Sequence, residues 1–231
     1  MTTNESFPKF DLPVDFIADD SITGDILNYY GNFPCKIKAG VFMLCTEGMV
    51  RATINLLEVV IRKNDFIVVL PNSFIQIHEV SSDTRISFAG FSSDFMLSGN
   101  YVEILLDFMP MILNSPVISL QEDVAGLYRN VYLLLIRAYT LPHSLENKEI
   151  IRSVLAIFLQ GTKELYKRYG KKLDEPLRRE QELYRQFIQL LMVHYTKEHE
   201  VAFYAEKCGV TAAHFSSAIR RASGYSPLAI I

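Results

Sequence analysis

The sequence predicts an α+β protein, and three observations support this prediction. Short stretches in which apolar residues alternate with polar ones, separated by turn residues, fill residues 41–91, which is the pattern of a small β-barrel or sandwich. From residue 123 onward the apolar residues recur with the period of a helix instead. A polar segment with Gly170 and Pro176 at its ends then precedes a further helical region, as expected of an interdomain linker.

The predicted strands are short and bounded by turn residues. They are residues 41–46, 49–55, 56–61, 66–70, 74–80 and 84–91. Glu47-Gly48 between the first two is a hairpin turn. Residues 66–70 are apolar throughout and stop at Pro71, so this strand is expected to be buried on both faces. The acidic pair Asp19-Asp20 is expected in a loop.

Two helices follow, residues 123–139 and 145–169, and Pro142 between them predicts an antiparallel pair. Their apolar residues cover more surface than a hairpin on one face of a barrel should need, which predicts a symmetric homodimer. A third helix is expected at 178–196. The predicted domain boundaries are 1–98 for the barrel, 99–170 for the helical dimerisation segment, 171–176 for the linker and 177–231 for an all-α segment.

Composition excludes several classes of protein. With 49% hydrophobic and 21% charged residues among 231, the chain has ample material for a core and is not intrinsically disordered. The longest apolar run, residues 131–136, is far too short to span a membrane. The N-terminal region is acidic, unlike a signal or transit peptide. Three cysteines without a CxxC spacing predict reduced thiols in a cytoplasmic protein.

Residues 201–224 have the spacing of a helix-turn-helix. Ala205, the fifth residue, allows close helix approach, and Gly209, the ninth, can adopt the positive φ that reverses the chain. Thr211 is expected to cap the second helix, and Phe215 is expected to face inward with Ala218 and Ile219. The alternative is an ordinary αα-corner. The charge balance allows nucleic-acid binding without demanding it, since residues 1–175 carry 16 basic and 21 acidic side chains and residues 176–231 carry 7 and 5.

The stretch from Thr211 to Pro227, TAAHFSSAIRRASGYSP, resembles the first helix-turn-helix of AraC/XylS-type transcription regulators. The N-terminal half, especially residues 41–48 and 65–80, resembles the cupin-type sensor domain of the same family. Family members normally carry two helix-turn-helix units joined by a long helix, and this chain stops about where the joining helix should begin. The sequence is therefore expected to be either a truncated chain or a shortened relative with one unit only.

The resemblance implies a cytoplasmic, ligand-responsive regulator whose partners are promoter DNA, a small-molecule effector and a second copy of the chain. The expected DNA-binding residues are Thr211, Ala213, His214, Ser216, Ser217, Arg220 and Arg221. By the family pattern, four of these (Ala213, Ser216, Ser217 and Arg220) face the major groove. Only Arg220 has the planar fork that binds guanine bidentately, so direct recognition of bases is expected to be modest.

Three polar residues on the predicted strands, Arg51, Gln76 and His78, are the candidates for binding the effector. The alternation of residues does not decide which face of each strand lines the barrel. A cupin-type enzyme that has lost its metal site is one alternative, and a dimerising regulator without any ligand is another. The histidine and glutamate spacing of cupin metal sites is missing after Gly48, and five residues after Pro71 stands Gln76 rather than histidine. No metal, cofactor, catalytic residue or membrane association is expected.

Overall fold

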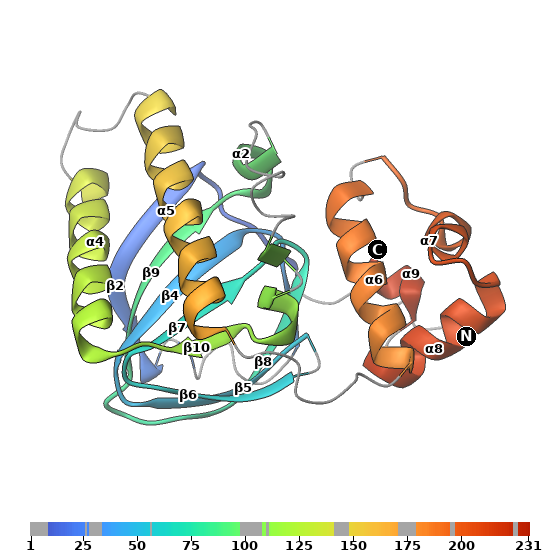
Figure 1. Cartoon of the computed structure of the whole chain (residues 1–231), viewed down its shortest axis with the longest axis horizontal. Helices are drawn as coiled ribbons and strands as arrows, with labels where there is room; N and C mark the ends of the chain where they lie inside the picture. The colour runs from blue at the N-terminus through green and yellow to red at the C-terminus, as the bar shows by residue number, and fades with distance from the viewer. Residues whose placement is uncertain are drawn as a thin grey trace. The chain divides into compact units, whose positions relative to one another are not determined.

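The computed structural model describes residues 9–231 except 26, 28–33, 56, 98–107, 110, 141–147, 171–178, 195–196 and 224–225 (Figure 1). The chain divides into two compact units, with a boundary between Lys172 and Leu173. The linker expected at 171–176 lies outside the described residues. None of the described helices is both long enough and apolar enough to cross a membrane.

In its described residues the N-terminal unit contains two five-stranded sheets, which confirms the predicted α+β class with its barrel-like N-terminal part. Sheet A has the order β1 (Lys9–Phe10), β3 (Cys35–Ile37), β8 (Ser73–Val80), β5 (Met49–Ile54) and β6 (Leu57–Arg62). Sheet B has the order β10 (Val117–Ser119), β7 (Asp65–Val69), β4 (Gly40–Glu47), β9 (Arg85–Phe91) and β2 (Phe16–Thr23). All pairings except that of β1 with β3 are antiparallel.

The two sheets pack face to face around an apolar core. Its buried residues come from both sheets: Cys45, Val50, Ala52, Ile54, Ile61, Ile67, Val69 and Ile86. Alternate residues of each strand contribute, because successive side chains of a strand point to opposite faces. Such a double sheet agrees with the expected cupin-like domain.

Helices cover the other face of sheet B. Helix α4 (Glu122–Thr140) and helix α5 (Lys148–Tyr169) lie side by side and run in opposite directions (Figure 1). Phe158 of α5 packs edge-on against Phe42 at 5.0 Å, and Tyr128 of α4 packs against Phe66 at 5.2 Å. Because sheet B lies between these helices and sheet A, every residue of β7 is buried. The prediction that this strand is buried on both faces is confirmed.

Helices α4 and α5 belong to the same compact unit as the sheets. The prediction of a hairpin at Glu47-Gly48 was wrong, because β4 belongs to sheet B and β5 to sheet A, and the two strands do not pair with each other. The chain instead passes from one sheet to the other through a tight turn at Gly48, which has φ +78°. A Cβ atom there would lie 2.5 Å from Thr84 Cα, so the turn needs glycine for its space as well as for its conformation.

The prediction for Asp19-Asp20 was wrong, because both residues lie within strand β2 and not in a loop. Strand β2 pairs only with β9 and forms the edge of sheet B, with a register shift between Asp19 and Ile22. Charged side chains are common on edge strands, so an acidic pair does not exclude a strand there. Strands β1, β3 and β10 and the short helix α2 (Ser93–Leu97) were also not predicted.

The C-terminal unit is all-α in its described residues. It comprises α6 (Arg179–His194), α7 (Val201–Lys207), α8 (Ala212–Ser223) and α9 (Pro227–Ile230). Phe187 of α6 lies 5.3 Å from the ring of Tyr204 and 5.1 Å from the ring of Phe215, both nearly perpendicular. These three rings are fully buried and fix α7 and α8 against α6, since perpendicular aromatic pairs are a preferred packing arrangement.

Candidate nucleic-acid interface and barrel interior

The connection between α7 and α8 is a tight turn centred on Gly209. This residue has φ +68°, which confirms the left-handed conformation expected from the sequence. The N–H of Val210 donates to Ala205 O at 3.0 Å, and the N–H of Gly209 donates to Glu206 O at 2.9 Å. This pair of hydrogen bonds is the Schellman motif that ends a helix and turns the chain away from it.

Helix α8 starts immediately after the turn. The N–H of His214 donates to Thr211 Oγ1 at 3.3 Å, so Thr211 caps the helix as predicted. Ala205 on α7 is buried, and so are Phe215, Ala218 and Ile219 on the inner face of α8, as the spacing predicted. The local geometry is therefore that of two short helices with a tight turn, packed on a third helix.

The outer face of α8 carries the DNA-binding residues that were expected from the sequence. Thr211, Ala213, His214, Ser217, Arg220 and Arg221 are exposed, and Ser216 is half-buried. With 100° between successive residues, Ala213, Ser217 and Arg220 point most directly away from the buried face. No described acidic side chain forms an ion pair with Arg220.

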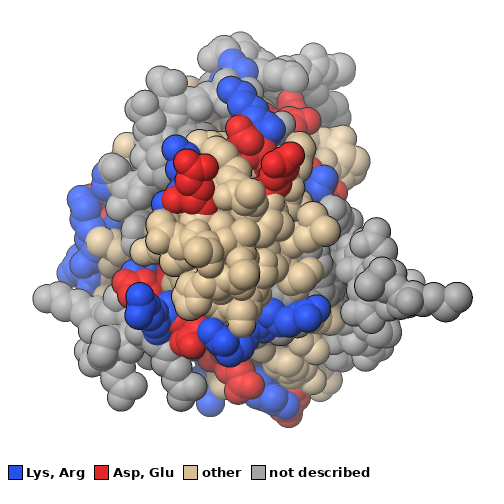
Figure 2. Space-filling model, turned by 90° about the vertical axis from the view of Figure 1, so that its right-hand side faces the viewer, with Lys and Arg blue, Asp and Glu red and all other residues tan. Residues whose placement is uncertain are grey.

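Arg221 is engaged within its own unit. Its Nη1 donates to Ser217 Oγ at 3.0 Å, and its Nε lies 3.6 Å from Glu180 Oε1 on α6. Arg220 and Arg221 are adjacent in sequence, but the guanidinium of Arg221 already has partners in its own unit. The sequence pattern did not reveal this difference. Figure 2 shows a broad uncharged area bordered by both acidic and basic side chains.

The space between sheets A and B is lined by apolar side chains. Val41 and Met43 lie on β4, the central strand of sheet B, and Ile75 and Ile77 lie on β8, the central strand of sheet A. All four pack against the buried core and yet remain partly exposed. Solvent therefore reaches apolar, inward-facing residues in the middle of both sheets.

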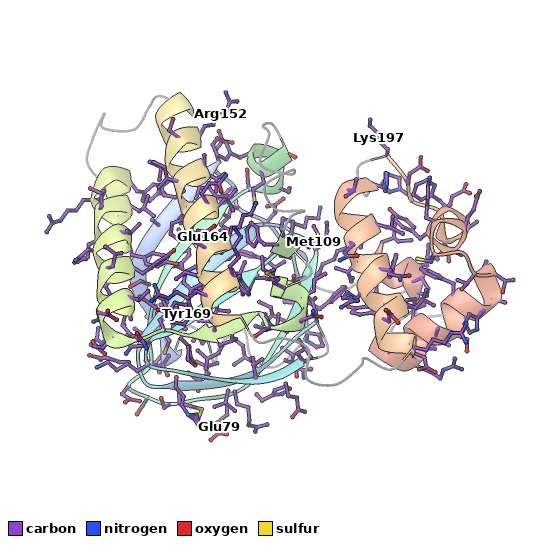
Figure 3. All side chains as sticks on the ribbon, in the orientation of Figure 1. Glu79, Met109, Arg152, Glu164, Tyr169 and Lys197 are labelled. Carbon is purple, nitrogen blue, oxygen red and sulfur yellow. The ribbon has the colours of Figure 1, made fainter. Side chains whose placement is uncertain are left out.

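The three candidate effector-binding residues do not belong to this lining. Arg51 and His78 are exposed on the opposite face of sheet A, where Arg51 Nε lies 3.3 Å from Glu79 Oε2 and His78 Nε2 lies 2.7 Å from Thr53 Oγ1. Figure 3 shows Glu79 at the outer surface of the strands. Gln76 pairs with Thr53 across the strands and shares its outward orientation. Their placement corrects the expectation that these residues line the barrel.

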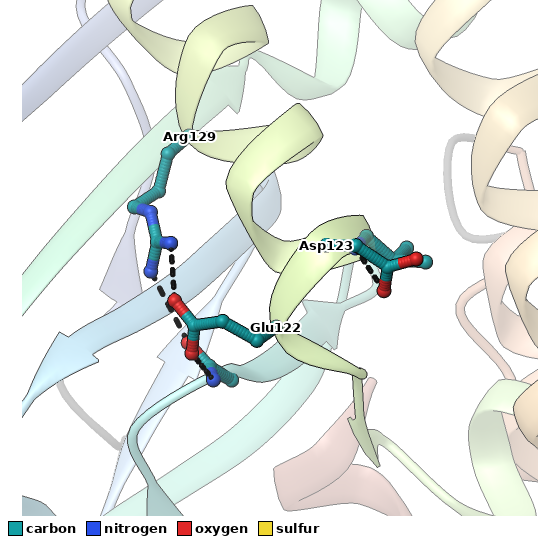
Figure 4. Close-up of polar contacts among 5 residues, drawn as sticks. Glu122, Asp123 and Arg129 are labelled. Atoms are coloured by element: carbon teal, nitrogen blue, oxygen red, sulfur yellow. Dashed lines mark hydrogen bonds and ion pairs between the residues drawn. The ribbon is translucent and has the colours of Figure 1, made fainter.

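A set of hydrogen bonds joins the turn between β6 and β7 to the start of α4 (Figure 4). Asn64 Nδ2 donates to Glu122 Oε2 at 2.6 Å, and Arg129 donates from Nη2 to Glu122 Oε1 at 2.6 Å and from Nη1 to Asn64 Oδ1 at 3.2 Å. The N–H of Leu120 also donates to Asn64 O at 3.0 Å. We call Asn64, Glu122 and Arg129 the turn clamp.

The clamp has an electrostatic consequence. Hydrogen bonds from Arg129 and Asn64 hold the pKa of the Glu122 carboxyl below its ordinary value. Asn64 has φ +69°, a conformation that asparagine adopts more readily than most residues. Asn64 lies in the polar break expected at residues 62–65, but no sequence pattern indicates the clamp, because its members are up to 65 positions apart.

Among the described residues, no group of three His, Cys, Asp or Glu side chains is arranged to hold a metal ion. Cys45 is fully buried in the core between the sheets, and burial raises the pKa of its thiol to about 12. Burial also raises the pKa of the Cys208 thiol, to about 11. Neither thiol has the lowered pKa typical of a reactive cysteine.

No protein-family model matches the chain, and no curated protein matches it in sequence. Among solved structures, the AraC-like transcriptional activator CuxR is similar with a TM-score of 0.46 and 9% identity, over 84% of this chain and 65% of that chain. The match thus spans less than two thirds of the length of CuxR.

ToxT from Vibrio cholerae O395, bound to (E)-4-(8-methylnaphthalen-1-yl)but-3-enoic acid, is similar with a TM-score of 0.35 and 11% identity, over 97% of both chains. The EutQ protein of Clostridium difficile is similar with a TM-score of 0.25 and 15% identity, over 34% of this chain and 69% of that chain. These likenesses are distant.

Proposed function

We propose that the chain is a ligand-responsive transcription regulator, in which the barrel holds a small apolar effector and α8 binds promoter DNA. The observation that carries this proposal is the turn at Gly209, which presents α8 with its inner face buried and with Ala213, Ser217 and Arg220 outward. A helix presented in this way fits the major groove of B-DNA, which is about 12 Å wide. No catalytic role is part of the proposal.

The DNA-binding part is tested by selecting duplexes from a random pool with the whole chain and measuring their affinity by fluorescence anisotropy. We expect the Arg220→Ala variant to lose affinity and sequence preference, because Arg220 is the one with a bidentate fork among the three most outward residues of α8. The matched control is Arg62→Ala, which removes an exposed arginine from the barrel. Equal losses in both variants, or recovery of no preferred sequence, would contradict the proposal.

The effector-binding part is supported by the partly exposed apolar side chains on both central strands. In a ligand-independent regulator, side chains are expected to fill the space between the sheets completely, because protein cores are normally close-packed. Because the lining named above is apolar, the expected effector is an apolar small molecule, bound by removal of its surface from water.

The chain contains no tryptophan, so a Met43→Trp variant carries a single fluorescent reporter between the sheets. We expect its emission to change saturably with decanol. The matched control is Val60→Trp, at a position 45% exposed on the outer face of sheet A, where no saturable change is expected. The same response from both variants would show that the space between the sheets is not the binding site.

Dimerisation is supported by the outward face of α4. Leu127 and Leu134 are seven residues apart and 61% and 67% exposed, whereas Tyr132 on the inner face is fully buried. A heptad spacing of apolar residues is the pattern of a helix that pairs with another helix. If two copies of α4 pair antiparallel and cross at Asn130, Asp123 of each copy lies opposite Arg137 of the other. These opposite charges would favour the pair.

We therefore expect a dimer by sedimentation at micromolar concentration, and a monomer for the Leu134→Glu variant. The control is Leu228→Glu, the same change at a residue of α9 that is 68% exposed. A wild-type monomer at about 100 µM, or dissociation in both variants, would remove dimerisation through α4 from the proposed function.

A further inference from the structure

The exposed residues of α8 define a chemical pattern that goes beyond DNA binding in general. Along the most outward line of the helix, the side chains are a methyl group at Ala213, a hydroxyl group at Ser217 and a guanidinium group at Arg220. Ser217 accepts a hydrogen bond from Arg221. The hydroxyl of Thr211 accepts the capping bond from the N–H of His214.

The exposed side chains in the first two turns of α8 are therefore small, apart from the imidazole of His214. Ala212 and Ala213 are both exposed, and residues 209–219 contain no Asp, Glu, Lys, Arg, Asn or Gln. Guanine and adenine are recognised in the major groove by forked side chains such as Arg, Asn and Gln. This end of the helix has none of them.

One base edge in the major groove is apolar. Thymine carries a C5-methyl group there, and alanine and the threonine methyl are among the groups that contact it. An alanine side chain also lets the helix backbone approach the base pairs closely, because nothing extends beyond Cβ.

Building on the proposed function, we propose that Ala213 recognises thymine through its C5-methyl group and that this contact, together with Arg220 on guanine, sets the sequence preference of α8. Ala213 and Arg220 are seven positions apart on the helix, which corresponds to roughly 10 Å along its axis at about 1.5 Å per residue. Base pairs of B-DNA are about 3.4 Å apart. The thymine and the guanine therefore lie about three base pairs apart.

The test uses a duplex selected by the whole chain from a random pool, resynthesised with deoxyuridine in place of thymine at one position at a time. Deoxyuridine pairs with adenine as thymine does and lacks only the C5-methyl group. We expect one position, about three base pairs from an essential G·C pair, at which this exchange weakens binding about fourfold. That change equals about 0.8 kcal/mol, the value for burying one methylene-sized group.

Two variants show whether Ala213 makes the contact. In Ala213→Gly the difference between thymine and deoxyuridine at that position should disappear, whereas in Ala212→Gly it should persist. The second variant is a matched control, since it makes the same substitution in the same turn at a residue off the outward line. Circular dichroism of both variants checks that α8 is retained.

The possible outcomes separate this inference from the proposed function. Sequence-selective binding that is unaffected by deoxyuridine at every position would overturn thymine recognition and leave DNA binding by α8 intact. Thymine recognition by Ala213 would also be overturned if Ala213→Gly and Ala212→Gly both kept, or both lost, the difference in affinity between thymine and deoxyuridine. Recovery of no preferred duplex would overturn the proposed function as well.

Discussion

Replacing Gly209 should destabilise the C-terminal unit by an amount that the structure allows us to calculate. Gly209 has φ +68°, and a Cβ atom built on it would have no atom within 4 Å. No steric clash with a neighbouring element contributes, so the cost of Gly209→Ala is the backbone cost of the left-handed conformation alone. That cost is about 1–2 kcal/mol for a residue with a Cβ atom.

The appropriate assay is amide hydrogen exchange in α7 and α8, because local opening free energies differ across a structure. A loss of about 1–2 kcal/mol corresponds to a roughly fivefold to thirtyfold faster exchange of these amides. Amides of β4 and β7 in the other unit should be unaffected. The Gly209→Asn variant should cost less than Gly209→Ala, since asparagine tolerates this conformation better.

Two results would refute this reasoning. Unchanged exchange in Gly209→Ala would mean that the residue does not need its positive φ in solution. Equal destabilisation by alanine and asparagine would mean that something other than backbone conformation limits this position.

Three further predictions concern charge and thiol chemistry. Arg221→Ala should reduce DNA affinity less than Arg220→Ala does, because Arg221 is already paired with Glu180; anisotropy titrations of both variants measure the difference. Arg129 and Asn64 lower the pKa of the Glu122 carboxyl from its ordinary value of 4.5. The stability that the ionised carboxyl adds through the clamp is therefore complete above pH 4.5 and is lost as the pH falls through the lowered pKa. A carboxyl titration by NMR should show that Arg129→Ala raises this pKa, and no rise would contradict the clamp. Cys45, buried and with its pKa raised to about 12, should resist iodoacetamide at pH 8 in the folded chain, and rapid labelling detected by mass spectrometry would show that the core opens readily.

The sequence predicted those features that depend on nearby residues. Alternation around Gly48 located β4 and β5, and the spacing of Ala205, Gly209 and Phe215 located the tight turn and the inner face of α8. In each case the physical cause lies within a few residues, as a turn that needs a positive φ or a face that needs burial.

Features that depend on distant residues could not be predicted in this way. Alternation shows that a strand has two faces, but only the pairing of β5 with β8 shows that Arg51 and His78 lie on the outer one. A register shift between Arg51 and Ala52 in that pairing further offsets the two strands. The engagement of Arg221 likewise depends on Glu180, which lies 41 positions earlier on a different helix.

The outer face of α8 is proposed to bind DNA, and a salt titration of the whole chain tests this most directly. The exposed basic groups near this face are Lys207, Arg220 and the partly neutralised Arg221. These two to three positive charges displace counterions from the DNA, so the logarithm of affinity for a selected duplex should fall with the logarithm of salt concentration with a slope of about −2 to −3. At each salt concentration the selected duplex should bind more tightly than a scrambled one, and Arg220→Ala should remove most of that difference. Equal binding of both duplexes, or a preference that survives Arg220→Ala unchanged, would show that α8 is not the DNA-binding surface.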